Sequence, residues 1–478
     1  MKKKIPIWLL PAQLMFSTIA FAQSAPGEIL SLQQCIETAV ANNLQVRQAA
    51  YQAQLSKVDY NQSRNNRLPA ISGNIAHGIN QGRSIDPFTN SYLNQEIGFA
   101  NYNINTSITL WNASSIQNGI RQNELNYQAS EQNWQQVKDN ITLNVILAYL
   151  QILSSKEQWN IAQKQAGVTR AQVARLEILH ASGSIAPATL YDLKGQLSTD
   201  ELTVLNLKNA LETAKISLAQ LMNIPYSASM DVATMSVNTV PILYEKEAAS
   251  IYQTALQQLA MIRAAGLRLQ GAQKGTKSAK AQMYPTLSLN GGLGTNYSSV
   301  ASTQQLISTS DVATPQYVMV NADKFNVFVP QNNYASQKIS YGDQWKNNFN
   351  SSVGISLQIP ILNRMLARNR IQQAVIAEKR AAFELTTTQT QVRQQIDQAY
   401  LNMQTALERL QTLEKQEADF RLSFKAAEVK FNAGANTSVD YMLAKNNLDR
   451  ASANLIAARY DFIFRNKILD FYQGKPLW

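Results

Sequence analysis

The chain of 478 residues contains the same sequence pattern twice, and this duplication limits what it can fold into. Residues 67–72 recur as 283–288 at an offset of 216 positions, and residues 148–150 recur as 399–401 at an offset of 251. Because the offset grows by 35 positions, the second copy contains one insertion. A repeat of this length indicates one structural unit built twice, not two unrelated domains.

We predict a first repeat over 23–222 and a second over 248–478, joined by a proline-containing linker at 223–247. Each repeat is predicted to run in the order helix, β-hairpin, long helix, helix. The hairpins are expected at about 70–111 and 286–361.

Very long helices are the second feature of each repeat. Residues 112–181 contain no proline, and a helix of that length reaches about 105 Å. A first helix is expected over 31–67, with a break at Asn42-Asn43, and a third helix over 188–222. The third helix and its duplicate have apolar or aromatic residues at every seventh position: Leu190, Leu197, Val204, Leu211 and Leu218, then Tyr441, Leu448, Leu455, Phe462 and Leu469. Such a period is typical of coiled-coil packing.

The predicted strands alternate strictly between apolar and polar residues. Tyr102, Ile104 and Ile108 alternate with polar residues at 101, 103, 105, 107 and 109. Residues 348–359 repeat the pattern. Strands of about ten residues with this period suit a membrane β-barrel, with the apolar side facing lipid. A half-buried sheet of a soluble domain is the alternative interpretation.

Four strands are too few to close a membrane barrel, for which about eight is the minimum. Several copies of the chain are therefore expected to associate. Two chains would supply eight strands and three would supply twelve, and the strand count does not choose between them.

The N-terminus has the features of a secretory signal. Lys2, Lys3 and Lys4 precede an apolar stretch at 5–19, and Ala20-Phe21-Ala22 fits a signal-peptidase site. We predict a signal peptide over 1–22.

The composition argues against a catalytic protein. Charged residues make up only 16% of the chain, and it has one cysteine, Cys35, and two histidines, His77 and His180. This leaves little material for a metal cluster or a Ser/His/Asp centre. The net charge of +11 comes with no basic run that has interleaved aromatics, so nucleic acid is not an expected partner. We expect no enzyme activity, no cofactor and no metal site.

Over residues 31–478 the chain resembles the TolC-type outer-membrane efflux proteins. The most specific parts are the glycine-containing helix turns at 181–187 and 432–438 and the C-terminal segments 444–448, 458–465 and 469–476, which look like the Bacteroidetes branch. The resemblance implies a fold that is mainly α with membrane β. It also implies a homotrimer, in which a 12-stranded outer-membrane β-barrel continues into a long periplasmic α-helical barrel.

The resemblance further implies partners and sites. The partners are a periplasmic adaptor protein, an inner-membrane pump and outer-membrane lipid. The helix turns are the expected adaptor-docking tips, at Gly183, Ser184, Gly434 and Ala435. Counting from each glycine gives candidate residues of a periplasmic gate: Ala188, Thr189, Phe431, Asn436 and Asp440. Asp192 is a further candidate, because it would place a second carboxylate near the tip.

Only Asp440 keeps the residue type that the family has at these gate positions. Asp192 and Asp440 would place carboxylates near the constriction and favour cations. The alternative is that they are first-turn carboxylates held by the helix dipole, and that Gly183 and Gly434 only make turns.

The favoured function is a passive outer-membrane duct in a tripartite efflux or secretion system. A periplasmic coiled-coil adaptor, or a surface structural protein without a channel, is the alternative, since either would also contain long heptad helices. The sequence leaves the exported substrate open among drugs, metals, siderophores and polypeptides.

Overall fold

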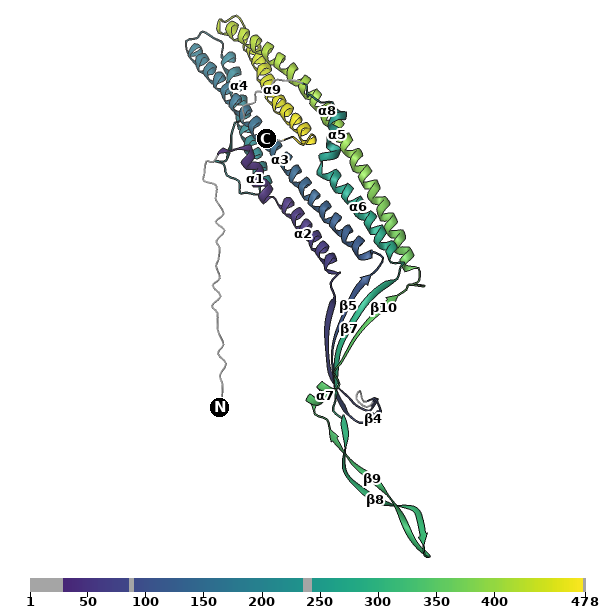
Figure 1. The fold of residues 1–478 in the computed structure, drawn as a ribbon. Helices are drawn as coiled ribbons and strands as arrows, with labels where there is room; N and C mark the ends of the chain where they lie inside the picture. Colours follow the sequence, from purple (N-terminus) through teal and green to yellow (C-terminus); the bar gives the residue numbers. More distant parts are fainter. Residues whose placement is uncertain (1–28, 86–89, 235–242, 476–478) are drawn as a thin grey trace, which may run out of the picture. The chain divides into compact units, whose positions relative to one another are not determined.

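The computed structural model describes residues 29–85, 90–234 and 243–475 (Figure 1). The predicted signal peptide at 1–22 lies outside the described residues. The chain divides into two compact units. The first contains residues 1–51, 132–262 and 389–478, and the second contains 52–131 and 263–388.

The helices dominate the chain, as predicted. They are α1 (Leu32–Asn42), α2 (Leu44–Asn65), α3 (Ser115–Ala181), α4 (Pro187–Met222), α5 (Ala248–Gln258), α6 (Ala260–Ala281), α7 (Tyr341–Asn347), α8 (Leu366–Asn432) and α9 (Ser438–Tyr472). The two long helices α3 and α8 have 67 residues each. Among the described residues, no helix combines the length and the apolarity needed to cross a bilayer.

The strands of the described residues fall into one four-stranded sheet and three two-stranded pairings. They are β1 (Ile29–Leu30), β2 (Ala70–Asn80), β3 (Arg83–Ile85), β4 (Tyr92–Asn94), β5 (Ile97–Trp111), β6 (Asp231–Val232), β7 (Thr286–Ser298), β8 (Ser302–Val320), β9 (Asp323–Lys338) and β10 (Asn350–Gln358). The larger sheet has the order β10-β7-β5-β2, while β1 pairs with β6, β3 with β4, and β8 with β9.

The predicted break in the first helix occurs at Asn43, whose extended backbone separates α1 from α2. Its side-chain amide donates to the Leu221 carbonyl at 3.0 Å, and its side-chain oxygen accepts from the Gln45 amide at 2.9 Å. The second repeat breaks at Leu259, between α5 and α6, with the same extended backbone. The two repeats therefore share this interruption although only the first has an asparagine there.

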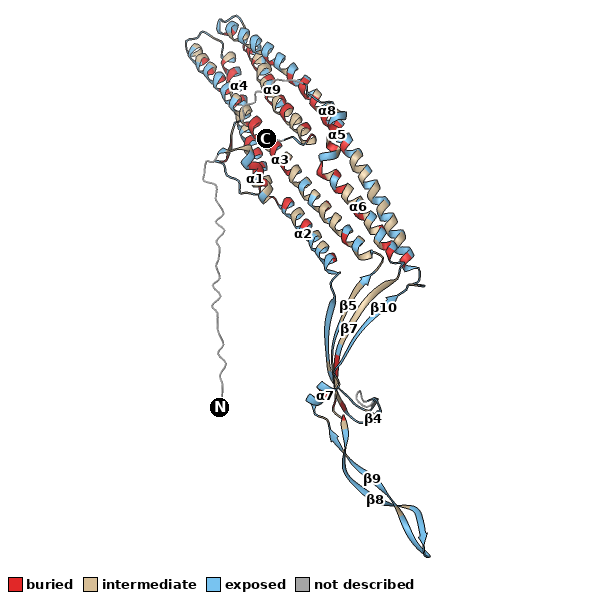
Figure 2. Ribbon diagram, viewed as in Figure 1, coloured by how far each residue is buried: buried red, intermediate tan, exposed pale blue. Residues whose placement is uncertain are grey.

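The core of the first unit gathers around the middle of α3 (Figure 2). Residues from α1, α4 and the β1–β6 pair, among them Cys35, Leu218 and Val232, pack against α3 residues such as Ile146. The buried hydroxyl of Tyr149 donates to the Ala233 carbonyl at 2.7 Å and ties the long helix to β6. Burial raises the pKa of Tyr149 to about 12, so this donor keeps its proton at neutral pH.

The large sheet of the second unit is antiparallel throughout and carries one apolar face. Across the four strands, Ile71, Thr106, Gly291 and Val353 are paired one to the next. Residues paired in this way lie on the same face of a sheet. The residues of this face are Ile71, Ile75, Ile79, Tyr102, Ile104, Ile108, Leu287, Leu289, Leu293, Val353, Ile355 and Leu357. Most of them are exposed, and Figure 2 shows β2 and β10 as almost wholly exposed strands. The opposite face presents Asn, Ser and Gly.

The helix α7 lies against one end of the apolar face. The Tyr341 ring packs on Tyr297, with ring centroids 4.8 Å apart, and the Trp345 ring packs on Tyr102 at 4.6 Å. The hydroxyls of Tyr102 and Tyr341 share a hydrogen bond of 2.6 Å. Aromatic side chains with polar tips thus collect at this end of the sheet.

The segment 298–343, inside the predicted second hairpin, is mostly a hairpin of its own, β8–β9, followed by the start of α7. Its strands pair with each other over most of their length. The reason lies in composition, because the part near the turn is rich in β-branched and aromatic residues such as Val318, Val320 and Phe325.

Both long helices begin directly after a pair of left-handed residues. Ala113 and Ser114 precede α3 with φ of 50° and 63°, and Arg364 and Met365 precede α8 with φ of 55° and 60°. Non-glycine residues rarely adopt this conformation. Its occurrence at equivalent positions of the two repeats indicates that the strand-to-helix turn requires it.

A labelling experiment tests the core of the first unit. Burial raises the pKa of the Cys35 thiol to about 12. Because thiolates are the reactive form, we expect the folded protein to resist maleimide at neutral pH, and labelling should be roughly 1,000-fold faster in denaturant. Rapid labelling of the folded protein, measured by mass spectrometry, would show that the α1 region is open.

Candidate gate and adaptor-docking tip

Two tight turns form the tip of the first unit. The first connects α3 to α4, and the second connects α8 to α9. In the first, the Gly183 amide donates to the His180 carbonyl and the Ser184 amide to the Leu179 carbonyl. The second repeats this pattern, and Gly183 and Gly434 have φ of 76° and 71°. These are Schellman motifs, in which a left-handed residue ends the helix at low cost when it is glycine.

The helices that follow the turns begin in different ways. Helix α4 has Pro187 in its first turn and no side-chain cap. Helix α9 begins with a capping box, in which the Thr437 hydroxyl accepts from the Asp440 amide at 3.1 Å. The Asp440 carboxylate in turn accepts from the Thr437 hydroxyl at 2.7 Å. This is the geometry expected if Asp440 serves to cap the N-terminus of α9, the alternative to a role in the gate.

Beneath the turns, all four helices contribute to one apolar core. It consists of Val173, Leu176, Leu190, Leu193, Phe431 and Tyr441. The rings of Phe431 and Tyr441 stack with centroids 4.8 Å apart. The Tyr441 hydroxyl is buried and finds no hydrogen-bond partner among the described residues, and burial raises its pKa to about 12.

Polar contacts also connect the two repeats at the tip. The Arg175 guanidinium donates to the carbonyl of Asn432 at 2.9 Å and to its side-chain oxygen, so it covers the C-terminal end of α8. The Ser438 hydroxyl donates to the Asp192 carboxylate at 2.9 Å. Each contact joins the α3–α4 hairpin to the α8–α9 hairpin, so neither hairpin can move away without breaking hydrogen bonds.

Further from the turns lies a buried ionic cluster centred on Lys445, which is 2% exposed. Its ammonium lies 2.5 Å from Asp449 and 2.9 Å from Asp200. The Asp200 carboxylate also accepts from the Thr169 hydroxyl at 2.5 Å. Burial raises the pKa of Asp449 even though Lys445 opposes this shift.

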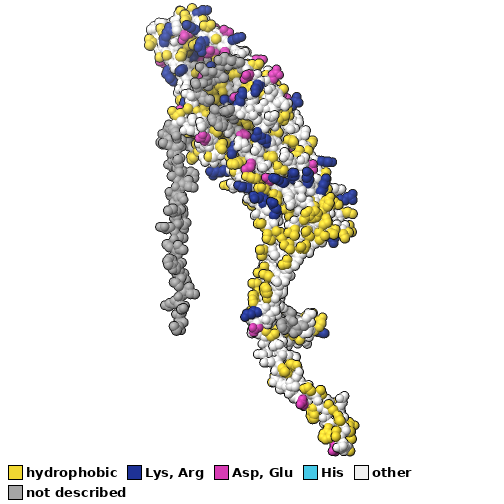
Figure 3. Space-filling view, viewed as in Figure 1, with side chains coloured by type: hydrophobic (Ala, Val, Ile, Leu, Met, Phe, Trp, Pro, Cys, Tyr) yellow, Lys and Arg dark blue, Asp and Glu magenta, His cyan; other side chains and the backbone are white. Residues whose placement is uncertain are grey.

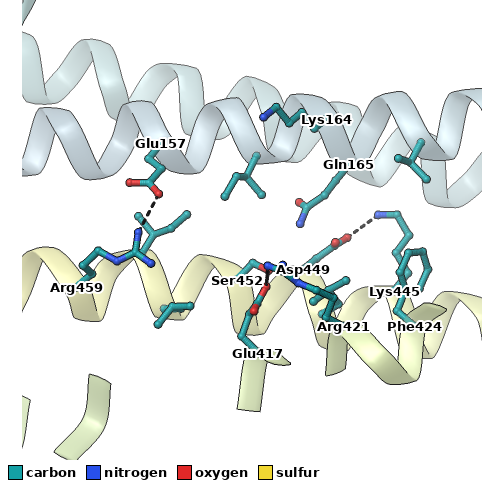
Figure 4. A pocket seen from close by; sticks show the side chains of 15 residues that line it. Glu157, Lys164, Gln165, Glu417, Arg421, Phe424, Lys445, Asp449, Ser452 and Arg459 are labelled. Atoms are coloured by element: carbon teal, nitrogen blue, oxygen red, sulfur yellow. Dashed lines mark hydrogen bonds and ion pairs between the residues drawn. The ribbon is translucent and has the colours of Figure 1, made fainter. Parts of the chain in front are cut away.

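A pocket of about 410 Å³ opens beside this cluster, between α3, α8 and α9 (Figure 4). Glu157 faces Arg459 at 3.4 Å across it, and Glu417 binds Arg421 at 2.6 Å. The Glu157–Arg459 pair joins α3 to α9, whereas Glu417 and Arg421 both lie on α8. Glu417 also accepts from the Ser452 hydroxyl at 3.2 Å, so it connects α8 to α9. Among the described residues, no group of three or more His, Cys, Asp or Glu side chains could hold a metal ion.

The predicted site residues therefore divide into three groups. Gly183, Ser184, Gly434 and Ala435 are exposed at the turns, which an adaptor-docking surface requires. Ala188, Asp192 and Asp440 are exposed, while Thr189 and Asn436 are half-buried. Phe431 lies inside the tip core.

Sequence reasoning missed Arg175 and Lys445. The spacing of Lys445 and Asp449, four residues apart on a helix, was a signal for an ion pair. No local signal indicated that Arg175 would reach Asn432.

Comparisons with known proteins agree with this architecture. The family model described as outer membrane efflux protein matches residues 35–223 and 251–469. The outer membrane protein TolC of Vibrio cholerae is 21% identical, over 97% of this chain and 93% of that protein. The crystal structure of CusC aligns with a TM-score of 0.75 at 16% identity, covering 98% of this chain and 99% of the other. The Campylobacter jejuni CmeC outer membrane channel gives 0.72 at 14% identity, covering 99% and 94%.

Substitution of Lys445 tests the buried cluster. Lys445→Met leaves two carboxylates without their cation, which we expect to destabilise the fold by roughly 3–5 kcal/mol. The matched control is Lys194→Met, because Lys194 pairs with Glu177 at the surface and exposed pairs contribute about 1 kcal/mol or less. Thermal unfolding followed by circular dichroism measures both, and equal melting temperatures would contradict the prediction.

Substitution of Tyr441 tests the tip core. Tyr441→Phe removes a buried hydroxyl without a partner in the described chain, so stability should be unchanged or higher. Tyr441→Ala should cost roughly 3–5 kcal/mol. If Tyr441→Phe destabilises the assembled protein by more than about 1 kcal/mol, the hydroxyl bonds to another copy of the chain.

Proposed function

The chain belongs to the outer membrane efflux protein family, and we propose that it is the outer-membrane channel of a tripartite efflux or secretion system. It is located in the cell outer membrane, with a periplasmic helical extension. The channel is a passive duct for substrates that an inner-membrane pump delivers through a periplasmic adaptor.

The observation that carries the proposal is the continuous apolar face of the four-stranded sheet. Aligned registers place Ile71, Val353 and Leu289 on one side and Asn103, Ser352 and Asn290 on the other. A side of this kind faces lipid, and its polar reverse lines a water-filled lumen. Eight of the twelve residues of this face are exposed, and a soluble adaptor would not expose so many apolar residues on one sheet face.

Aromatic residues lie at both ends of the apolar face, where the proposed channel meets the two membrane–water boundaries. Tyr102 lies at the α7 end of the apolar face and Trp111 at the helix end, about nine residues apart along β5. Nine residues extend about 30 Å, or about 23 Å after a strand tilt near 40°. This matches the apolar band of about 25 Å in outer-membrane barrels, which aromatic residues flank on both sides.

The sheet edges support a trimer. In the sheet, β2 and β10 are the edge strands. Lipid offers no partners to their backbone groups, so β2 of one copy pairs with β10 of the next until the sheet closes. Three copies give twelve strands, the number that the family resemblance implies.

The tip supplies the docking and gating functions. The exposed turns at Gly183, Ser184, Gly434 and Ala435 contact the adaptor. The closed state of the gate depends on Arg175 and Asp192, because their hydrogen bonds to Asn432 and Ser438 hold the two hairpins of a protomer together. Opening the gate breaks these bonds. Ala188, Thr189, Phe431, Asn436 and Asp440 make up the rest of the gate region.

Conductance and fractionation test the function. The purified protein should migrate as a heat-modifiable trimer and open channels in planar bilayers, and in cells it should remain with outer membranes. Recovery of a soluble monomer after osmotic shock would contradict the proposal and favour the adaptor alternative.

Paired lysine substitutions test the two sheet faces. Val353 lies at the level of Thr106, midway along the apolar band, so Val353→Lys should cost roughly 2–4 kcal/mol and reduce trimer recovery. Ser352→Lys, one residue away on the polar face, should assemble normally and change ion selectivity. If both variants assemble equally well, the proposed lipid-facing side is wrong.

Removal of the tip bonds tests the gate. The double variant Arg175→Ala and Asp192→Ala should increase single-channel conductance or open probability, because it frees the hairpins. Asp440→Ala is the comparison, since it removes a helix cap that contributes about 1 kcal/mol and should affect stability more than conductance. If the double variant has unchanged conductance, Arg175 and Asp192 stabilise the tip but do not control the gate.

A further inference from the structure

A belt of positive charge lies on the helix side of the apolar sheet face (Figure 3). Four segments leave the strands there, at 60–69, 112–121, 276–285 and 359–370. Together they contain eight basic residues and no Asp or Glu: Arg64, Arg67, Arg121, Lys277, Lys280, Arg364, Arg368 and Arg370. We call these eight residues the basic collar. All of them are exposed.

The opposite end of the strands has no such bias. The connections at 81–96 and 299–349 contain four basic and five acidic residues. The excess of positive charge is therefore specific to one end of the sheet and does not follow from the net charge of the chain.

The basic collar adjoins an exposed apolar surface. Ile361 is 94% exposed and Leu362 is 80% exposed, and only one residue separates Leu362 from Arg364. Figure 3 shows hydrophobic side chains gathered next to the band of Lys and Arg. Apolar surface beside positive charge is the pattern of a membrane–water boundary, where acyl chains meet headgroups.

Three members of the collar line a pocket of about 530 Å³ between α2 and α3. Arg64, Arg67 and Arg121 meet there, with one carboxylate, Glu124, which lies 2.6 Å from Arg121. The Arg64 guanidinium also lies over the Tyr60 ring, 5.7 Å from its centroid. The pocket retains a surplus of two positive charges, and guanidinium groups bind phosphate oxygens well.

We propose that the basic collar binds the phosphate headgroups of anionic phospholipids in the leaflet next to the helices, with the strongest site at Arg64, Arg67 and Arg121. This inference rests on the proposed membrane orientation of the sheet. Headgroup binding fixes the depth of the sheet in the bilayer, because the collar holds one boundary while the α7 aromatics hold the other.

Lipid titration of the delipidated, purified trimer tests this inference. Native mass spectrometry measures the binding of phosphatidylglycerol and phosphatidylcholine at low and high salt. We expect a clear preference for phosphatidylglycerol at low salt that falls at high salt. Equal binding of the two lipids would overturn the proposal.

Charge removal locates the site. The triple variant Arg64→Gln, Arg67→Gln and Arg121→Gln should lose roughly 100-fold in affinity for phosphatidylglycerol, since each basic residue near an anionic surface contributes about fivefold. The matched control Lys324→Gln, Lys338→Gln and Lys346→Gln removes three charges from the other end of the strands and should bind like the unchanged protein. If both variants lose affinity for phosphatidylglycerol equally, binding depends on the net charge of the protein and not on these three arginines.

Free phosphate distinguishes a lipid site from an ion site. Inorganic phosphate should compete weakly, because it lacks acyl chains to contact exposed apolar residues beside the site, such as Leu68, which follows Arg67 and is 65% exposed. Full competition at equal concentration would overturn the lipid assignment. Conductance is recorded on the same samples, so a channel that conducts without lipid preference refutes this inference alone, and a protein that does not conduct refutes the proposed function.

Discussion

The backbone groups of a sheet edge impose the strongest constraint on this protein. In hydrocarbon an unpaired amide or carbonyl has no water to bond, and the order β10-β7-β5-β2 gives the sheet two such edges. One chain is therefore not stable alone in the membrane in this form. In the proposed channel, insertion and assembly are therefore a single process, and the apolar face contacts lipid while the closed sheet surrounds the lumen.

The two repeats differ in the connection between β7 and β10, which contains the insertion, and in the way the helices begin at the tip. Helix α9 carries its own capping box at Thr437 and Asp440, whereas α4 begins without a side-chain cap. Each hydrogen bond that connects the hairpins has one partner in each repeat, Arg175 with Asn432 and Asp192 with Ser438. The two duplicated hairpins therefore stabilise each other.

Periodic features of the fold could be predicted from the sequence. The long helices α3 and α8 follow from the absence of proline, and α4 follows from heptads such as Leu190 and Leu211. The strands follow from alternation around Tyr102 and Ile104. The hairpin β8–β9 was not predicted because its alternation is interrupted by register shifts near Ile307 and Thr314.

The candidate site was less predictable, because its interactions depend on tertiary packing. Lys445 lies on a helix that is expected to pack through heptad residues such as Tyr441 and Leu448, and it is itself buried beside two carboxylates from different helices. Phe431 was placed by its distance from Gly434, and that count does not reveal that its ring packs on Tyr441. Position along the chain was sufficient to find the turns but did not show which side chains meet beneath them.

The left-handed residue pairs before α3 and α8 have a consequence for how this fold tolerates change in length. At these junctions a two-residue period passes directly into a 3.6-residue period. Inserting one residue there would rotate the whole helix by about 100° and point its packing stripe away from its neighbours. The junctions are therefore closed to insertions and deletions, whereas the connection between β7 and β10 has absorbed a long addition without disturbing either helix. Variation in length is confined to the end of the sheet that is far from the helices.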